Sequence, residues 1–154
     1  MFKMSWDYLI VFILGGMIFS EIRGSILYGL GANLNIPLVF LVGALGNMLA
    51  VIVIFLLLER LNFLPLAKRL FGKKVYARIE KNKKRLEKWE ELALLFFVAI
   101  PLPITGAWTG SLVAILLEMN KKKAFVVISI GIIIAGLITL GVAQGFITGV
   151  NFLR

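Results

Sequence analysis

The apolar positions of this chain gather into long runs that are separated by short polar interruptions. The clearest run covers residues 38–58 and, at the helical rise, would extend about 31 Å, close to the thickness of a bilayer hydrocarbon core. Gly43 and Gly46 give one side of this run small residues, which allow another helix to approach closely. A second long apolar run covers residues 124–147. The pattern therefore predicts two transmembrane helices.

The chain ahead of the first span is also apolar, but it is interrupted. Residues 6–19 form one short helical pattern of about 21 Å, which is too short to cross the hydrocarbon core. The charged stretch Glu21-Ile22-Arg23-Gly24 follows, and residues 24–32 form a second short pattern that ends at a turn before Pro37. The sequence therefore predicts a helical hairpin with a polar break before the first span.

The stretch between Glu91 and Glu118 is uncharged and long enough for one span, but Pro101 and Pro103 interrupt it. Each proline removes a backbone donor and moves the preceding residue out of the helical region. What remains is a pair of short helices, residues 92–99 and 105–117. The pair is either a kinked span or a hairpin that enters and returns on the same side of the membrane.

Charge on the two flanks favours the hairpin. A basic segment lies before the stretch, at residues 59–91, and Lys121-Lys122-Lys123 follows it. A span would place one of these clusters outside, against the tendency of Lys and Arg to stay cytoplasmic, whereas a re-entrant hairpin keeps both inside. The kinked span stays open, because this rule is a bias and three lysines form a small cluster.

The basic segment itself has apolar residues roughly on one helical side and cations on the rest, which is typical of an amphipathic helix on a lipid surface. We expect it to be cytoplasmic and to contact anionic headgroups. Its charge alone gives no reason to expect nucleic acid as a partner. The candidate lipid-surface residues are Lys68, Arg69, Lys73, Lys74, Lys81, Lys84 and Arg85.

Composition narrows the function further. The 154 residues are 60% hydrophobic and their mean hydropathy is +0.98, which indicates one integral membrane domain spanning residues 1–154. Cysteine and histidine are absent, which removes thiolate nucleophiles and the commonest metal ligand and general base, so we expect no enzyme, no metal and no cofactor. The N-terminal run has no small-residue cleavage pattern, and we expect it to be retained.

The predicted elements fall into two similar halves, residues 6–58 and 92–147. Each half reads as a short helix, a break, a short helix, a turn and a span, and GSILYG at 24–29 resembles GAWTG at 106–110. The two hairpins would enter the membrane from opposite sides, which makes the halves inverted. The expected fold class is thus an all-α polytopic membrane protein of two inverted repeats joined by the basic amphipathic segment, an architecture typical of transporters.

The first break holds Glu21 and Arg23, and a charge inside a membrane costs at least about 2.5 kcal/mol on insertion scales. One hypothesis is that Glu21 binds a proton and that Arg23 binds an anionic group such as phosphate. The alternative is that both side chains extend from a shallow loop to the outer headgroups. Since residues i and i+2 do not face each other on a helix, a direct pair between them would require the break to be non-helical.

The second break offers several candidate binding groups. Thr105 and Thr109 supply hydroxyls, Gly106 and Gly110 allow close backbone approach, and Trp108 supplies an aromatic wall. The exposed amides that begin the 105–117 helix would favour an anion. The alternative is purely conformational: prolines and glycines form a tight turn, and the tryptophan fills space.

The stretch PLPITGAWTGSLVAILL resembles the signature of the small multidrug export protein family, and EIRGS at 21–25 resembles the first motif of that family. The similarity covers nearly the whole chain, although Ile104 stands where the family commonly has glycine after the second proline. The family is also distantly similar to the DedA-like membrane proteins, which are associated with lipid transport and have two opposed re-entrant loops. The resemblance implies as motif positions Glu21, Arg23, Gly24, Pro101, Pro103, Thr105, Gly106, Trp108, Thr109 and Gly110.

The favoured hypothesis is therefore a small secondary transporter or DedA-like lipid flippase that moves an amphipathic or phosphate-bearing substrate. Proton coupling through Glu21 is part of this hypothesis. We expect a homodimer in the plasma membrane, with membrane lipids and a small amphipathic or anionic lipid substrate as partners. The alternative is a non-transporting scaffold or lipid-binding protein that acts through its basic segment.

Overall fold

The computed structural model describes residues 2–63, 65, 89–100 and 105–152. In these residues the chain is helical, without a strand, which confirms the all-α prediction. Two helices, Ile36–Arg60 and the Lys121–Gly149 part of the last one, are long and apolar enough to cross a membrane. The helices are α1 (Phe2–Gly16), α2 (Glu21–Gly31), α3 (Ile36–Arg60), α7 (Glu90–Ala99), α8 (Ala107–Leu116) and α9 (Lys121–Phe152).

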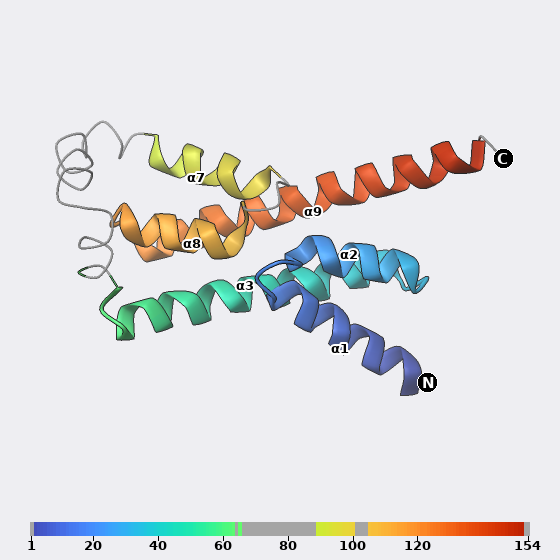
Figure 1. Ribbon diagram of the computed structural model, residues 1–154, viewed down its shortest axis with the longest axis horizontal. Helices are drawn as coiled ribbons and strands as arrows, with labels where there is room; N and C mark the ends of the chain where they lie inside the picture. Colours follow the sequence, from blue (N-terminus) through green and yellow to red (C-terminus); the bar gives the residue numbers. More distant parts are fainter. Residues whose placement is uncertain (1, 64, 66–88, 101–104, 153–154) are drawn as a thin grey trace.

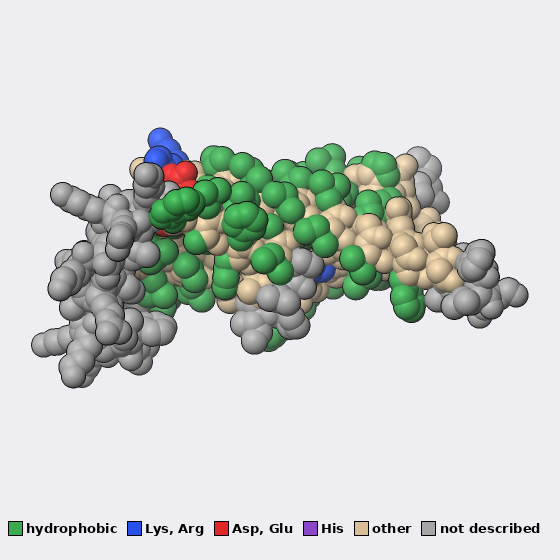
Figure 2. Space-filling model, turned by 90° about the horizontal axis from the view of Figure 1, so that it is seen from above, with side chains coloured by type: hydrophobic (Ala, Val, Ile, Leu, Met, Phe, Trp, Pro, Cys, Tyr) green, Lys and Arg blue, Asp and Glu red, His purple; other side chains and the backbone are tan. Residues whose placement is uncertain are grey.

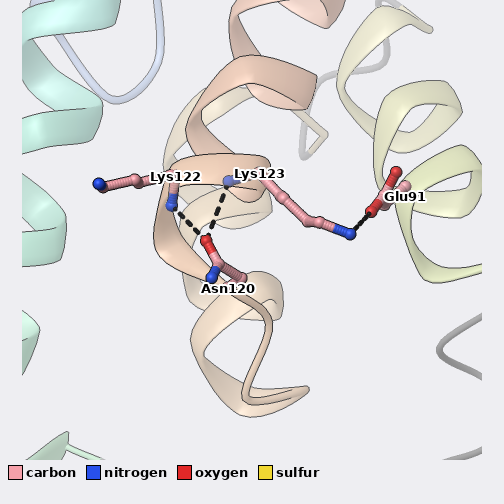
Figure 3. A network of polar contacts seen from close by, with 4 residues as sticks. All are labelled: Glu91, Asn120, Lys122 and Lys123. Atoms are coloured by element: carbon pink, nitrogen blue, oxygen red, sulfur yellow. Dashed lines mark hydrogen bonds and ion pairs between the residues drawn. The ribbon is translucent and has the colours of Figure 1, made fainter.

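Asparagine side chains define the starts of both long helices. The Asn35 side chain accepts a hydrogen bond from the Leu38 amide at 3.2 Å, and a proline stands in the first turn of α3. At α9, the Asn120 Oδ1 atom accepts from the amides of Lys122 at 3.0 Å and Lys123 at 3.3 Å (Figure 3). Each cap satisfies amides that have no partner within the helix, so both long helices begin at short polar turns.

The helix boundaries differ from those expected, most of all at the first break. The α2 helix begins at Glu21 rather than at Gly24, so the charged residues form its first turn and the break lies at residues 17–20. The reason is that backbone hydrogen bonds continue through this region, from the Glu21 amide to the Met17 carbonyl and from the Gly24 amide to the Ser20 carbonyl. A charged side chain does not by itself end a helix.

The other boundaries shift by a few residues. Both long helices extend beyond the predicted 38–58 and 124–147, because the polar residues at their ends continue the backbone pattern. The α1 helix ends at Gly16 rather than at residue 19, and α8 is shorter than the predicted 105–117 because it starts only after Gly106.

The six helices form two groups of three, and the groups pack against each other (Figure 1). In the first group α1 and α2 both contact α3, and in the second α7 and α8 both contact α9. The groups meet where α2 packs on α9 and where α8 packs on α3. Apolar side chains from both groups form the shared core, including Ile22, Ile26, Val51, Ile128 and Ile132.

Glycines bring α1 and α3 unusually close together. A Cβ atom added to Gly15 would overlap the Gly43 carbonyl, and one added to Gly46 would overlap the Phe12 carbonyl. The backbone of α1 thus lies against the backbone of α3. The side of α3 that was expected to offer small residues, at Gly43 and Gly46, is the side that packs on α1.

Polar contacts at the two ends of the molecule fix the direction of each short helix pair. At one end, the Lys121 ammonium pairs with Glu59 of α3 at 2.7 Å and the Lys123 ammonium pairs with Glu91 of α7 at 3.1 Å (Figure 3). The end of α3 and the starts of α7 and α9 therefore lie together. Since α8 ends just before α9, the α7–α8 pair begins and finishes at this same end (Figure 1).

The α1–α2 pair is held at the opposite end. The Tyr28 hydroxyl donates to the Asp7 carboxylate at 2.9 Å, and the Asn35 amide donates to the Tyr8 hydroxyl at 3.3 Å. These bonds join the first part of α1 to the end of α2 and the start of α3. The starts of α2 and α8 consequently both lie in the middle of the molecule (Figure 1).

The surface of the described chain is strongly apolar. Figure 2 shows hydrophobic side chains over the central part of the molecule, and most charged atoms in that view lie at one end. Large side chains such as Leu41, Leu56 and Leu137 are more than half exposed. The basic residues predicted to contact lipid, from Lys68 to Arg85, lie outside the described residues, so that prediction stays a prediction.

We predict that Gly46→Ala lowers the free energy of unfolding by about 1–3 kcal/mol, because the new methyl group meets the rigid Phe12 backbone. The matched control is Gly141→Ala on α9, where an added Cβ has nothing within 4 Å. That change should be neutral or stabilising, since alanine favours a helix over glycine. The measurement is unfolding in detergent, and equal stability of the two variants would contradict the packing described here.

Candidate functional site

The starts of α2 and α8 meet in the middle of the molecule, and Glu21 joins them. The Glu21 side chain is buried, and its Oε1 atom accepts a hydrogen bond from the Trp108 amide at 3.4 Å. A Cβ atom on Gly106 would overlap this carboxylate. The backbone of Gly106 is extended, with φ 165°, so glycine is required at this position for space rather than for conformation.

This contact corrects one expectation about the second break. The amides at the start of α8 were predicted to favour an external anion, but the carboxylate of Glu21 already lies against them. A carboxylate at a helix start gains up to about 2 kcal/mol from the helix dipole in a partly buried setting. Glu21 also has a positive φ of 50°, which is unusual for a residue with a side chain and typical of functional sites.

Arg23, two residues after Glu21, reaches the same break. Its Nη2 atom donates to the Thr105 carbonyl at 2.7 Å, two residues before α8 begins. The two charged side chains of α2 thus bind complementary backbone groups of the second break, an amide for Glu21 and a carbonyl for Arg23.

Trp108 connects the second break to α1. Its indole Nε1 atom donates to the carbonyl of Gly16, the last residue of α1, at 3.1 Å. That carbonyl belongs to a helix end and has no partner within the helix. The tryptophan was predicted to form a wall or fill space, and the structure gives it this hydrogen bond as well.

The two threonines of the motif bind the chain itself. The Thr105 hydroxyl donates to the Ile100 carbonyl at 2.8 Å, which closes the break after α7, and the Thr109 hydroxyl donates to the Gly106 carbonyl at 3.3 Å. These bonds support the conformational alternative for both hydroxyls. Pro101 and Pro103, with Ile104, lie outside the described residues.

The remaining motif glycines serve helix packing. A Cβ atom on Gly110 would lie 2.6 Å from the Val98 Cγ2 atom of α7, and one on Gly24 would overlap the Ser20 side chain. These two residues therefore lie at contacts within their own helix pairs.

A pocket of about 120 Å³ lies at the meeting point of the two breaks. Its lining combines predicted site residues of both breaks with two apolar residues that the sequence reading did not select. Ile18 and Phe19 are the missed pair, and their position directly before the charged stretch is the signal that could have identified them. The lining residues are Ile18, Phe19, Glu21, Arg23, Thr105, Trp108 and Thr109.

The two short helices that start at the site share a local sequence. Gly24-Ser25 occupies the fourth and fifth positions of α2, and Gly110-Ser111 occupies the same positions of α8. Both serines are fully buried, and their hydroxyls donate to Val11 and Ala107 carbonyls at 2.7 Å. Gly24 and Gly110 thus hold the same position in their helices, whereas the sequence comparison set Gly24 beside Gly106.

Comparison with known proteins supports the resemblance seen in the sequence. Residues 21–138 match a family model described as "Putative small multi-drug export protein". The match begins at Glu21, directly after the first break, and it covers the second break. No curated protein and no solved structure matches the chain.

We predict that Gly106→Ala destabilises the protein by about 1–3 kcal/mol through its clash with Glu21. If this clash is the cause, Glu21→Ala should relieve it, and the double variant should be more stable than the sum of the single effects by about 0.5–3 kcal/mol. Unfolding of the four proteins in detergent gives this coupling.

Gly145→Ala serves as the control in the same cycle, because nothing lies within 4 Å of a Cβ atom there. Its effect should add to that of Glu21→Ala. If the stability effects of Gly106→Ala and Glu21→Ala were also strictly additive, the contact between these residues would not be the cause of the destabilisation by Gly106→Ala.

Proposed function

Since the chain belongs to the small multidrug export protein family, we propose that it is a small secondary transporter or lipid flippase of DedA-like type. Family membership and the two long apolar helices make it a membrane protein with a transporter-like role. The proposal is that it moves an amphipathic or phosphate-bearing molecule through the pocket between the two breaks.

The proposed architecture is an inverted repeat of two re-entrant hairpins, α1–α2 and α7–α8, each followed by a span. Three features support it. The hairpins are held at opposite ends of the molecule, by Tyr28 with Asp7 and by Lys123 with Glu91. Their bends meet midway, and each second arm packs on the long helix of the other half. Irregular backbone at membrane depth is tolerated where it lines a cavity, and Ile18, Phe19 and Thr105, which lie next to the two helix starts, line the pocket.

The observation that carries the proposal is the pair of polar contacts that Glu21 and Arg23 make with the second break at the pocket, which we call the polar joint. Glu21 and Arg23 of one hairpin hold the backbone of the other, through the Trp108 amide and the Thr105 carbonyl. Hydrogen bonds to charged groups are worth about 1.5–3 kcal/mol each, so a competing ligand can exchange with them. An anionic group would compete for Arg23, and a proton on Glu21 would weaken its hold on α8.

In this mechanism the joint couples the ligand to the movement of the halves. Occupation of Arg23 by a phosphate or carboxylate group releases the Thr105 carbonyl, and protonation of Glu21 releases the Trp108 amide. The hairpins can then separate on one side of the membrane and close on the other. The apolar wall of Ile18 and Phe19 suits the hydrocarbon part of an amphipathic substrate.

The proposed setting is the plasma membrane, with the basic segment 60–90 on the cytoplasmic side and a homodimer as the assembly. The ion pairs of Lys121 and Lys123 lie at the end of the molecule to which that segment connects. Anionic headgroups on this side would attract the segment. If the tests below find no transport, they favour the alternative, a scaffold that acts through the basic segment alone.

We predict opposite sidedness for single cysteines at Asn33 and Lys122 in the cysteine-free chain. An impermeant thiol reagent applied to intact cells should label the Asn33 site and leave the Lys122 and Lys83 sites unlabelled. Labelling of the Lys122 site together with protection of the Lys83 site would make residues 92–117 a span, and the inverted repeat would be abandoned.

We predict that Arg23→Ala slows transbilayer movement of fluorescent phosphatidylglycerol in proteoliposomes at least tenfold, because the anionic headgroup loses its guanidinium partner. Quenching by dithionite measures the rate. Arg60→Ala removes a cation at the exposed end of α3 and should leave the rate unchanged.

Full activity of Arg23→Ala would remove this residue from substrate binding. In the same vesicles Glu21→Gln should abolish the response to a pH gradient, since the amide cannot take up the proton. No lipid movement by the unaltered protein would reject the flippase.

A further inference from the structure

The packing of α2 against α3 has a regular register. A Cβ atom on Gly29 would lie 2.6 Å from both Cγ atoms of Val39, and one on Gly43 would lie 2.6 Å from the Ser25 Cβ atom. The two helices are antiparallel and joined by a short turn, so each step of four residues back along α2 matches four residues forward along α3. Continued by one step, this register would place position 21 of α2 opposite Asn47 of α3.

Asn47 is the most unusual polar residue of the interior. It is fully buried in the middle of α3, and neither its Nδ2 nor its Oδ1 atom has a hydrogen-bond partner in the part of the chain that the structure describes. Glu21, Ser25 and Ser111, the other polar residues in the buried class, all have hydrogen-bond partners, and the Ser129 hydroxyl of α9 is a further buried group without one in the described residues. A buried amide without partners costs free energy, most of all within a membrane, and such a group needs an explanation.

Helix packing does not require an amide at this position. In the second half, Gly110 of α8 lies opposite Ile128 of α9, with 3.9 Å between the position of its Cβ atom and the Ile128 Cγ1 atom. One turn further along α9 are Gly131 and Ile132, which are buried and apolar. The corresponding place is thus filled without any polar side chain.

We infer that Asn47 and Glu21 enclose a buried water site, which extends the pocket inward to α3. Water suits this pair, because it accepts from the Nδ2 donor, donates to Oδ1 and donates to a carboxylate. Buried waters of this kind satisfy polar groups that the fold leaves without partners.

The consequence for transport rests on the proposed function. Waters between Asn47 and Glu21 would give the carboxylate a route for protons on the side away from the Trp108 amide. Asn47 would then be a positioning residue that holds the waters and does not itself touch the substrate.

The test is the reactivity of single cysteines at Asn47 and at Val51 with a small water-soluble methanethiosulfonate reagent, on the purified protein in detergent. Val51 is the matched control, because it is also fully buried and lies one turn further along the same side of α3. We expect the cysteine at position 47 to react at least tenfold faster than the one at position 51. The exposed Asn33→Cys variant confirms that the reagent is active.

Equal and slow reaction at both positions would make the interior around Asn47 dry and overturn the inference. Labelling needs no substrate, so this failure is distinct from a failure of transport. If the flippase assay fails while position 47 still labels rapidly, the water site stands and only its proposed consequence is lost.

A second variant keeps the test independent of how well the cysteine variant folds. Asn47→Leu removes the amide without shortening the side chain, and it should leave melting unchanged or raised. With a water site, the response of lipid movement to a pH gradient should fall at least tenfold. A variant that melts at or above the normal temperature and keeps this response would overturn the proposed route for protons, and the labelling at position 47 decides the water site itself.

Discussion

The fold depends on how the chain satisfies polar groups where its helices break inside an apolar environment. Glu21 supplies an acceptor for such groups, since its carboxylate lies against the start of α8 at Gly106 and Trp108. The amides at that helix start have no partners within the helix and would otherwise lack them. A charge from one half thus completes the backbone of the other, and Arg23 completes the adjoining carbonyl of Thr105.

This arrangement also explains why the residues around the charges are small. Gly106 leaves room for the carboxylate, Gly24 lets α2 begin tightly after Ser20, and Gly43 lets α3 approach Ser25. Each glycine removes a side chain at a place where another polar or backbone group must come close. Large apolar side chains cover the outside of the same helices, as expected for a surface in contact with lipid. The result is a polar centre within an apolar exterior.

Local patterns were enough to predict the broad fold, because they depend only on neighbouring residues. The long apolar runs gave the two long helices, and the charged and proline-containing stretches gave the two breaks. The contacts between the breaks could not be predicted, since Glu21 and Trp108 lie far apart in the sequence and no periodicity links them. The start of α2 was placed three residues late for a related reason: Glu21 starts a helix instead of interrupting one. Asn47 was missed because one amide in an apolar run does not alter the helical pattern.

The position of Glu21 limits how an anionic substrate can bind in the proposed transport cycle. Its carboxylate occupies the amides where an external anion would otherwise be stabilised, so such a ligand has only Arg23 as a strong partner while Glu21 stays charged and in place. Binding at Arg23 loosens one half of the joint, and uptake of a proton by Glu21 loosens the other. Because both events act on the same contact between the halves, ligand and proton can be coupled without any rearrangement transmitted through the rest of the fold.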